Sequence, residues 1–398
     1  MYALIHGKIY TGDTKADTRQ EPLTDHALLI EGDRIVDLIS IADLSDDCKA
    51  IDLGGDWVAP GFIDLQLNGC GGVMFNDAIT SETLDTMHQT NLKSGTTSFL
   101  PTLITSSDED MLAAMEVMQP YREAHPYSVP GLHLEGPYLN PKRKGIHNES
   151  YIRQPDRTML QRIADYGRET VKLITLAPEV VAPDQIRLLA DSGIVVSAGH
   201  TEASFEQAIR GFDSGVQMAT HLFNAMSPWQ GRNPGMVGAI FSRSDIYTGI
   251  IADGHHVHFA SIQLAHQIKQ DKLLLVTDAT PPVGTQMDSF WIGGHQVFYR
   301  DGKCLSPDGT LGGSALTMIE AIANCVRYVQ IPLPEALRMA STYPAQVIGM
   351  EQELGKIGPG YLANLAIFNA DFQITGTVDS GRYESTQVAV GSASYSGR

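Results

Sequence analysis

The 398-residue chain has few cysteines and few basic residues, and each shortage excludes a class of protein. Its four cysteines form no C-x-x-C pair, so we expect neither a disulfide framework nor a thiolate zinc motif. Lys and Arg total 28 against 46 Asp and Glu, and the net charge of −18 argues against nucleic acid or an anionic membrane as a partner. No run approaches the roughly 20 apolar residues of a membrane helix. The first residues, MYALIHG, also lack the basic and apolar regions of a signal peptide, so a reducing cytoplasm is the expected setting.

The first 57 residues predict short strands rather than helices. Two apolar runs, 27–30 and 34–37, flank the turn residues Glu-Gly-Asp and predict a hairpin. A hairpin cannot bury a core by itself, and the strand-like run 364–368 near the C-terminus is its expected partner. We therefore expect a small β-sandwich domain built from residues 1–57 and 355–382. The Ser- and Gly-rich residues 383–398 predict a flexible tail.

From about residue 58, eight short apolar runs alternate with helical periodicity. The runs are 62–66, 97–100, 132–135, 173–176, 194–197, 217–221, 249–252 and 273–277. Helical patterns follow at 81–93, 108–118, 157–167, 184–191, 203–213 and 259–268, and two more lie at 315–329 and 334–348. Eight strand-then-helix units predict an α/β fold, a closed (β/α)8 TIM-like barrel over residues 58–354. An open doubly wound sheet is the alternative, but no G-x-G-x-x-G motif follows an early strand.

Polar residues gather where the predicted strands end, which is where such barrels carry their active sites. They are Gln66, Asn68, Glu135, His200, His221, His255, His256 and Asp278. Each has an ordinary alternative, such as an exposed carboxylate or a hydrogen-bonded structural histidine. One carboxylate and two imidazoles, however, make an open three-ligand set, which is typical of catalytic zinc rather than of closed structural sites. Together these residues predict a metal site.

Asp278 follows the last apolar run, in the segment VTDAT. A carboxylate beside a metal-activated water is well placed to take its proton and later deliver that proton to a leaving amine. The alternative is an Asp that caps the following loop, but no helix follows closely, since Pro281 and Pro282 come next. We therefore interpret Asp278 as a candidate general acid/base.

Six motifs occur in order along the chain. They are PGFIDLQLNGCGG at 60–72, HLEGP at 133–137, SAGH at 197–200, THLFNAM at 220–226, IADGHH at 251–256 and VTDAT at 276–280. In combination they resemble the N-acetylglucosamine-6-phosphate deacetylases of the amidohydrolase superfamily, and the resemblance covers about residues 1–375. It implies a barrel with a small β-sandwich from both chain ends. It also implies hydrolysis of N-acetylglucosamine 6-phosphate to glucosamine 6-phosphate and acetate in amino-sugar catabolism.

The resemblance also implies roles for individual residues. Glu135, His200 and His221 would bind the metal, and Asp278 would be the general acid/base for the attack of a metal-activated water. His147 would polarise the acetamide carbonyl, although without the resemblance it would be interpreted as a solvated loop residue. Substrate contacts are implied for Ile146, His147, Asn224, Ala225, Arg232, Asp253, His255, His256, Leu311, Gly312 and Gly313.

A phosphorylated substrate needs local cations in so acidic a chain. Arg232 and His256 would supply them, because a guanidinium binds phosphate bidentately, although an Arg in a Gly- and Pro-containing loop is usually a surface charge. The N–H groups of 311–313 also suit sugar or phosphate oxygens, and the alternative there is an ordinary helix cap at Ser314. Members of the family are commonly dimers whose phosphate site is completed by the neighbouring subunit. The resemblance therefore implies a homodimer or a tetramer.

The number of metal ions is predicted from a difference between this sequence and the usual pattern of the superfamily. The broader superfamily carries His-x-His on its first strand for a second metal, and here Gln66 and Asn68 stand in those places. Amides are poor zinc ligands. Two-metal relatives also carry a carbamylated lysine at the end of the fourth strand, whereas Lys172 lies at the start of that strand. We expect one divalent ion per subunit, with zinc first and iron, cobalt or manganese as alternatives.

Three other functions stay open at this point. A deacetylase for the epimer N-acetylgalactosamine 6-phosphate would differ in loops that the sequence does not place. A cyclic-amide hydrolase would mostly need the two-metal set that Gln66 and Asn68 disrupt. A non-enzymatic scaffold would fit the loss of His-x-His, but a decayed site would not keep the Glu, both His and the Asp at strand ends.

Overall fold

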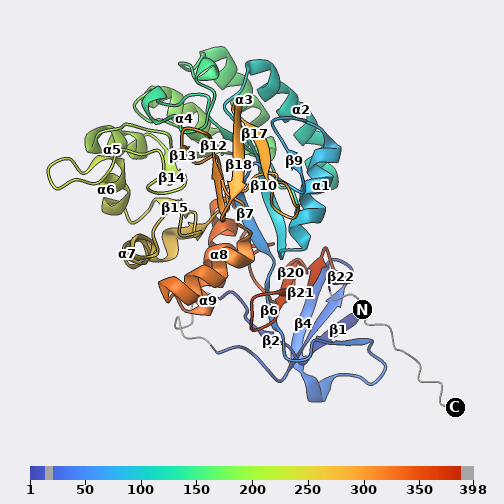
Figure 1. Cartoon of the computed structure of the whole chain (residues 1–398). Helices are drawn as coiled ribbons and strands as arrows, with labels where there is room; N and C mark the ends of the chain where they lie inside the picture. The colour runs from blue at the N-terminus through green and yellow to red at the C-terminus, as the bar shows by residue number, and fades with distance from the viewer. Residues whose placement is uncertain (14–20, 387–398) are drawn as a thin grey trace.

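The computed structural model describes residues 1–13 and 21–386. Its central sheet has eight parallel strands in the order β16-β15-β14-β13-β12-β11-β10-β7. Their bounds are β7 (Phe62–Leu67), β10 (Thr96–Ile104), β11 (Leu132–Glu135), β12 (Val171–Leu176), β13 (Val195–Ala198), β14 (Val216–Ala219), β15 (Tyr247–Ile250) and β16 (Leu273–Leu275). A parallel bridge between Leu67 and Ala279 brings the first strand against the segment after the last. The sheet is thus a nearly closed barrel, and the predicted fold class is confirmed (Figure 1).

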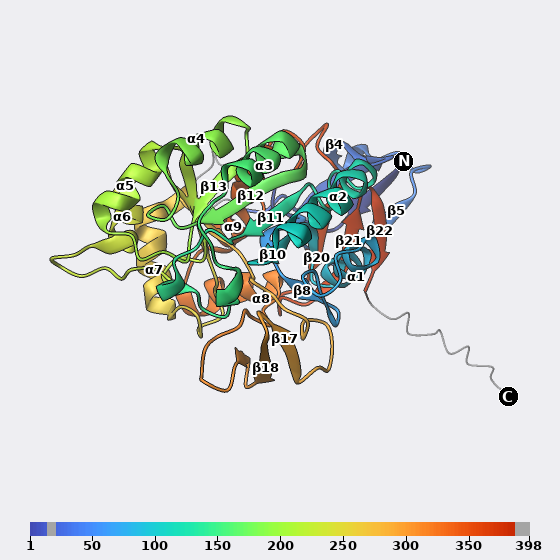
Figure 2. The ribbon, with the colours of Figure 1, turned by 90° about the horizontal axis from the view of Figure 1, so that it is seen from above.

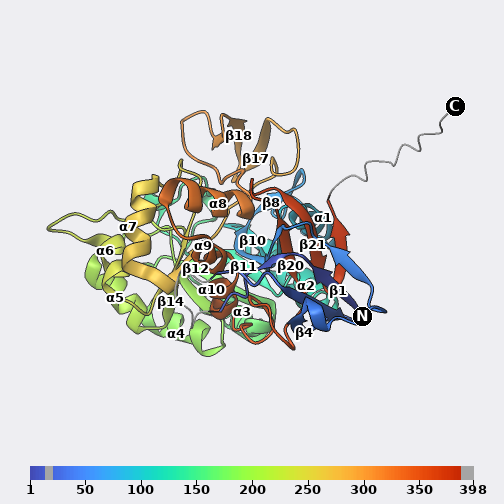
Figure 3. The same cartoon turned by 90° about the horizontal axis from the view of Figure 1, so that it is seen from below.

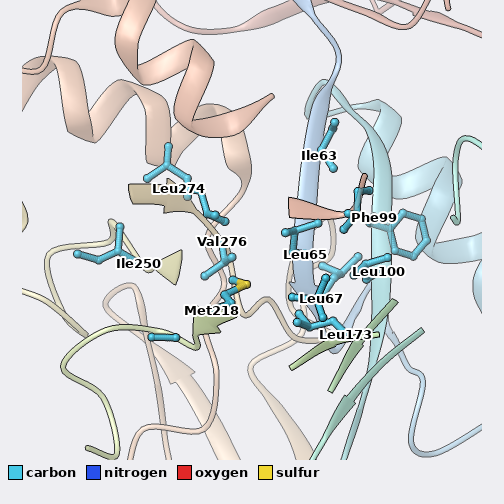
Figure 4. Close-up of a cluster of buried hydrophobic side chains, with 14 of the residues drawn as sticks. Ile63, Leu65, Leu67, Phe99, Leu100, Leu173, Met218, Ile250, Leu274 and Val276 are labelled. Carbon is cyan, nitrogen blue, oxygen red and sulfur yellow. The ribbon is translucent and has the colours of Figure 1, made fainter. Parts of the chain in front are cut away.

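The barrel is filled by apolar side chains from strands all around it. Leu65, Leu100, Leu173, Met218 and Leu274 are each no more than 2% exposed, and Figure 4 shows them converging from several strands. Helices cover the outer face of the sheet, so both faces of each strand are buried. This is why the strands appear in the sequence as nearly continuous apolar runs. The packed interior gives a rigid base for the polar residues at the rim.

The outer helices agree with most of the predicted ones, with local differences. They are α1 (Ser81–Leu92), α2 (Asp108–Ala124), α3 (Arg157–Thr170), α4 (Pro183–Asp191), α5 (Phe205–Asp213), α6 (Gly235–Ser242), α7 (Phe259–Lys269), α8 (Met318–Asn324), α9 (Leu333–Ala340) and α10 (Thr342–Val347). Short 3-10 turns lie at Ile41–Asp43, Pro141–Arg143, Glu149–Tyr151 and Gln270–Lys272. Seen from below, α9 and α10 cross the end of the barrel opposite the site (Figure 3).

A small antiparallel sheet between the last barrel strand and α8 was not among the predicted elements. It comprises β17 (Ser289–Ile292), β18 (His295–Arg300) and β19 (Lys303–Leu305). Its buried face, with Phe290 and Val297, packs against Ile104 at the end of β10 and Ile146 in the loop after β11. Figure 2 shows it as a separate leaf beside the rim of the barrel.

The two chain ends build a second, smaller unit. One sheet has the order β4-β3-β1-β5 and the other the order β2-β6-β20-β21-β22. The strands are β1 (Tyr2–Ile5), β2 (Lys8–Ile9), β3 (His26–Glu31), β4 (Arg34–Ser40), β5 (Ala50–Asp52), β6 (Trp57–Pro60), β20 (Leu365–Phe368), β21 (Ile374–Asp379) and β22 (Arg382–Ser385), and a two-stranded ribbon, β8 (Gly69–Cys70) with β9 (Val73–Met74), lies after β7. Val58 pairs with Ile367, so the expected partnership of the two chain ends is present.

The predicted tail begins too early. Residues 383–385 belong to β22, which pairs with β21 through Tyr383 opposite Val378, whereas residues 387–398 lie outside the described part. The division into 1–57 with 355–382 and 58–354 stays a prediction. Among the described residues, no helix has the length and apolar character needed to cross a membrane.

Candidate metal centre and active site

Three predicted ligands meet at the C-terminal rim of the barrel. Glu135 ends β11, and His200 and His221 follow β13 and β14. Glu135 Oε1 lies 3.2 Å from His200 Nε2 and 3.1 Å from His221 Nε2, and the two ring nitrogens are 3.1 Å apart. Nitrogen and oxygen ligands about 2.0–2.2 Å from a tetrahedral zinc ion lie about 3.3–3.6 Å from one another, slightly farther apart than these three atoms. The three donor atoms therefore fit one divalent ion.

A second contact orients the His200 imidazole. His200 Nδ1 lies 2.8 Å from the Arg143 carbonyl oxygen, which must accept its proton, so the lone pair of Nε2 faces the cluster. The φ angles of His200 (48°) and His221 (29°) lie in the left-handed region, an energetic cost that surrounding contacts must offset. Burial opposes a charge on Glu135, but its close contacts with the His200 and His221 rings outweigh this and hold the pKa of Glu135 well below its usual value. A buried carboxylate kept ionised between two ring nitrogens is suited to a cation.

Asp278 faces this cluster from the segment after β16. Its Oδ1 accepts hydrogen bonds from Asn68 Nδ2 (2.7 Å) and Gln66 Nε2 (3.3 Å), and Gln66 Nε2 also donates to Glu135 Oε1 (3.1 Å). Both amides thus present N–H groups to carboxylates rather than ligand oxygens to a second ion. Burial, together with the charge of Glu135, raises the pKa of Asp278 to about 6. A carboxyl with this pKa can accept and return a proton near neutrality.

His147 lies beside the cluster on the loop after β11. Its ring centre is 4.3 Å from that of His200, and Nδ1 is 2.8 Å from Thr105 Oγ1. Burial and the neighbouring His200 lower the pKa of His147 to about 3, so its imidazole is neutral. The solvated-loop interpretation is wrong, because His147 is only 3% exposed.

A cavity of about 310 Å³ opens above these groups. Its lining includes the predicted residues Ile146, Asn224, Ala225, His256, Leu311 and Gly313. It also includes Ile104, Ile292 and Thr310, and two cations, Lys142 and Arg143, that were not predicted. The run Lys-Arg-Lys in an acidic chain, between Glu135 and His147, is the sequence signal that would have found these cations.

The remaining predicted contacts do not line the cavity. Asp253 lies behind His256, and its Oδ2 is 2.6 Å from His256 Nδ1. This contact occupies Nδ1, so Nε2 is the ring nitrogen that remains for other partners. His255 is exposed, and Gly312 is buried behind Ile146. Arg232 is exposed on the loop before α6, which projects from the side of the barrel (Figure 1).

Comparisons with known proteins agree with this geometry. Residues 57–383 match the amidohydrolase family, and residues 1–58 match the NagA composite domain. N-acetylglucosamine-6-phosphate deacetylase from Haemophilus influenzae is 43% identical over 386 residues, which cover 96% of this chain and 99% of that protein. N-acetylgalactosamine-6-phosphate deacetylase from a Shewanella species is 37% identical over 89% of this chain and 91% of its own length. The crystal structure of N-acetylglucosamine-6-phosphate deacetylase from Pasteurella multocida has a TM-score of 0.93 and 46% identity, and covers 96% of this chain and 99% of its own.

The nearly closed barrel and its Glu-His-His cluster define the class: the chain belongs to the amidohydrolase family, whose members are metal-dependent hydrolases. Within that family, its relatives over nearly the whole length are deacetylases of N-acetylhexosamine 6-phosphates.

Proposed function

We propose that the protein hydrolyses N-acetyl-D-glucosamine 6-phosphate to D-glucosamine 6-phosphate and acetate in amino-sugar catabolism. The observation that carries this proposal is the cluster of Glu135, His200 and His221 facing Asp278 across one cavity. Similarity to deacetylases over nearly the whole chain supports the reaction and the sugar.

Glu135, His200 and His221 would hold one divalent ion. When bound, such an ion lowers the pKa of a coordinated water to about 7 and polarises a carbonyl oxygen. Asp278 takes one proton from the attacking water and returns it to the amine nitrogen as the C–N bond breaks. Its Oδ1 is held by Asn68 and Gln66, so Oδ2 is the oxygen left for this transfer. The products balance: the acetyl carbon gains the water oxygen, and the amine gains the proton.

His147 stabilises the developing charge on the carbonyl oxygen. For this it must donate from Nε2, which requires Thr105 Oγ1 to donate its hydrogen to Nδ1 (2.8 Å) rather than to the Glu135 carbonyl oxygen (3.3 Å). The low pKa of His147 favours the neutral imidazole, which in this tautomer donates a hydrogen bond from Nε2 without a net charge.

The phosphate is assigned to two residues, His256 and Arg232. His256 lines the cavity, and because its Nδ1 contacts Asp253 Oδ2, Nε2 is the ring nitrogen that would contact the phosphate. Arg232 lies outside the cavity of its own chain. We therefore assign it to the phosphate of a neighbouring subunit in a homodimer, where the exposed Trp229 on the same loop would be covered.

Other assignments complete the proposal. Zinc is the first candidate for the ion, because one carboxylate and two imidazoles are ligands that it accepts. The small domain is assigned to residues 1–57 with 355–382, and the barrel to 58–354. Cys70, Cys304 and Cys325 are buried free thiols, which fits a reducing cytoplasm.

Acetate release from three compounds tests the proposal. N-acetylglucosamine 6-phosphate should be hydrolysed fastest, and unphosphorylated N-acetylglucosamine should react far more slowly because the phosphate contacts are lost. N-acetylgalactosamine 6-phosphate is the second candidate substrate, since a relative with 37% identity carries that name. Preference for this epimer would keep the mechanism and overturn the assigned sugar. No release from any compound by metal-loaded protein would overturn the function.

A further inference from the structure

Barrel strand β12 contributes no side chain to the cavity lining, yet a carboxylate just beyond it contacts both loops around His200. Glu179 Oε1 accepts hydrogen bonds from Asn140 Nδ2 (2.9 Å) and from the backbone N–H of Glu202 (2.7 Å). Its Oε2 accepts one from Thr201 Oγ1 (2.6 Å). One side chain thus joins the loop after β11 to the loop after β13.

Both of these loops hold His200 in place. The Asn140 backbone N–H donates to the His200 carbonyl oxygen (2.9 Å), and Thr201 is the next residue along the chain. The loop that contains Asn140 continues to Arg143, whose carbonyl oxygen fixes the His200 ring (2.8 Å), and then to His147. Glu179 therefore contacts the groups on either side of His200, and it does so without touching the cavity.

The backbone at His200 needs such support. Its φ of 48° is in the left-handed region, which a residue with a Cβ occupies only when surrounding contacts impose it. The ring must also keep Nε2 within 3.2 Å of Glu135 Oε1. Three hydrogen bonds from two loops onto one carboxylate supply a constraint of this kind, because an acceptor charge strengthens each bond.

We propose that Glu179 is a positioning residue, which sets the backbone and ring orientation of His200 and the placement of the His147 loop. It acts through these residues and does not contact the substrate. The assignment rests on the proposed function, since it presumes that His200 is a metal ligand.

Replacement of Glu179 separates positioning from general stability. Glu179→Ala should weaken metal affinity and lower kcat, each by about 10- to 100-fold, the range found for residues that orient metal ligands. KM for the sugar phosphate should change much less, because Glu179 lies outside the cavity. The visible absorption spectrum of the cobalt-loaded protein should shift, since it reports the geometry of the ligands.

Glu179→Gln should restore much of the loss. The amide oxygen can still accept from Asn140 and Glu202, but Thr201 must then accept from the amide nitrogen, and Thr201 Oγ1 already accepts from the Ala203 N–H (3.0 Å). Thr201→Val removes the third bond, together with the acceptor of the Ala203 N–H, while keeping the other two bonds to Glu179, and it serves if Glu179→Ala does not fold. It should give a smaller shift of the cobalt spectrum in the same direction.

Glu335→Gln is the matched control. Glu335 is also a largely buried carboxylate with several partners, Arg338 and Tyr343, but it lies on α9, away from the cavity. It should lower Tm while leaving kcat and the cobalt spectrum unchanged. If wild-type protein is active, and both Glu179→Ala and Thr201→Val keep its kcat, metal affinity and cobalt spectrum, the positioning role is wrong. If wild-type protein binds metal and hydrolyses nothing, the proposed function fails first.

Discussion

Asp278 has a left-handed backbone, with φ at 52°, like the two histidines opposite it. Strain of this kind, roughly 1–3 kcal/mol at each residue, persists where surrounding structure imposes it, and it gathers at functional sites. Here the backbone N–H of Asp278 donates to the Gln66 carbonyl oxygen (2.9 Å), and its carbonyl oxygen accepts from the Ser314 N–H (2.8 Å). These bonds fix the backbone that carries the Asp278 carboxyl beside the Glu-His-His cluster.

Asp278→Asn should lower kcat by about 10²- to 10⁴-fold, the usual contribution of a general acid/base. The amide keeps an oxygen that can accept from Asn68 but cannot take a proton from water. Metal content, measured by elemental analysis, should be unchanged. A variant with near-normal kcat would remove Asp278 from the proton transfer.

Asp64, a buried residue of β7, predicts a dependence of stability on pH. Burial raises its pKa to about 7, although Thr277 and the Gln66 N–H donate hydrogen bonds to it. This value lies above the roughly 3.9 of an unfolded chain, so the stabilisation is complete below about pH 4 and is lost as pH rises through 7. Asp64→Asn keeps the shape and does not ionise. Between pH 4 and 8 its Tm should therefore fall less than that of wild-type protein; equal slopes would contradict the raised pKa.

At the scale of residues, the strand pattern predicted the site residues that follow strands, whereas loop residues of the cavity were named only through the family resemblance or, like Lys142 and Arg143, were missed. Glu135, His200, His221 and Asp278 are placed by strand ends, which a hydrophobic pattern locates. Lys142 is brought to the cavity by the path of a loop that no periodicity encodes.

At the scale of elements, the β17–β19 sheet is tied to the loop that carries His147. Gly293, in the turn between β17 and β18, has φ at 57°, and a Cβ there would lie 2.1 Å from the Ile146 carbonyl oxygen. The adjacent Gly294 has φ at 82°, but the nearest atom to its Cβ would be Asn148 Nδ2 at 3.7 Å. Alanine at either position would therefore strain the backbone, but only alanine at 293 would also clash with Ile146.

Gly293→Ala should lower kcat/KM by displacing the segment 146–148, whereas Gly294→Ala should lower Tm less, through its positive φ alone, and leave kcat/KM near the wild-type value. Steady-state kinetics and thermal melts of both variants make the comparison. Equal kinetic effects would show that the contact with Ile146 does not matter for the site.

Helix boundaries show where local pattern gives way to tertiary packing. The predicted helix 334–348 is two helices, because Ser341 departs from helical geometry (φ −137°, ψ −65°) where the chain turns across the end of the barrel. The predicted helix 315–329 likewise changes to a π-helix at Cys325–Val329. The leaf β17–β19 was missed because its exposed face carries Trp291, so its strands lack clean alternation.

At the scale of the whole molecule, the proposed homodimer, in which Arg232 contacts the phosphate bound by the neighbouring subunit, predicts active sites shared between subunits. Arg232→Ala and Asp278→Asn homodimers should both be nearly inactive. Mixed and allowed to exchange, they form heterodimers with one intact site, and activity should rise to about a quarter of the wild-type value. Activity that never exceeds the sum of the two separate variants would place Arg232 outside a shared site.

The measurement that tests the central claim most directly is a metal titration of metal-free protein, followed by acetate release from N-acetylglucosamine 6-phosphate. One ion held by Glu135, His200 and His221 predicts activity that rises linearly to one equivalent of zinc per chain and then stays level. Activity without any metal, or a rise that continues to two equivalents, would contradict the single-metal deacetylase site.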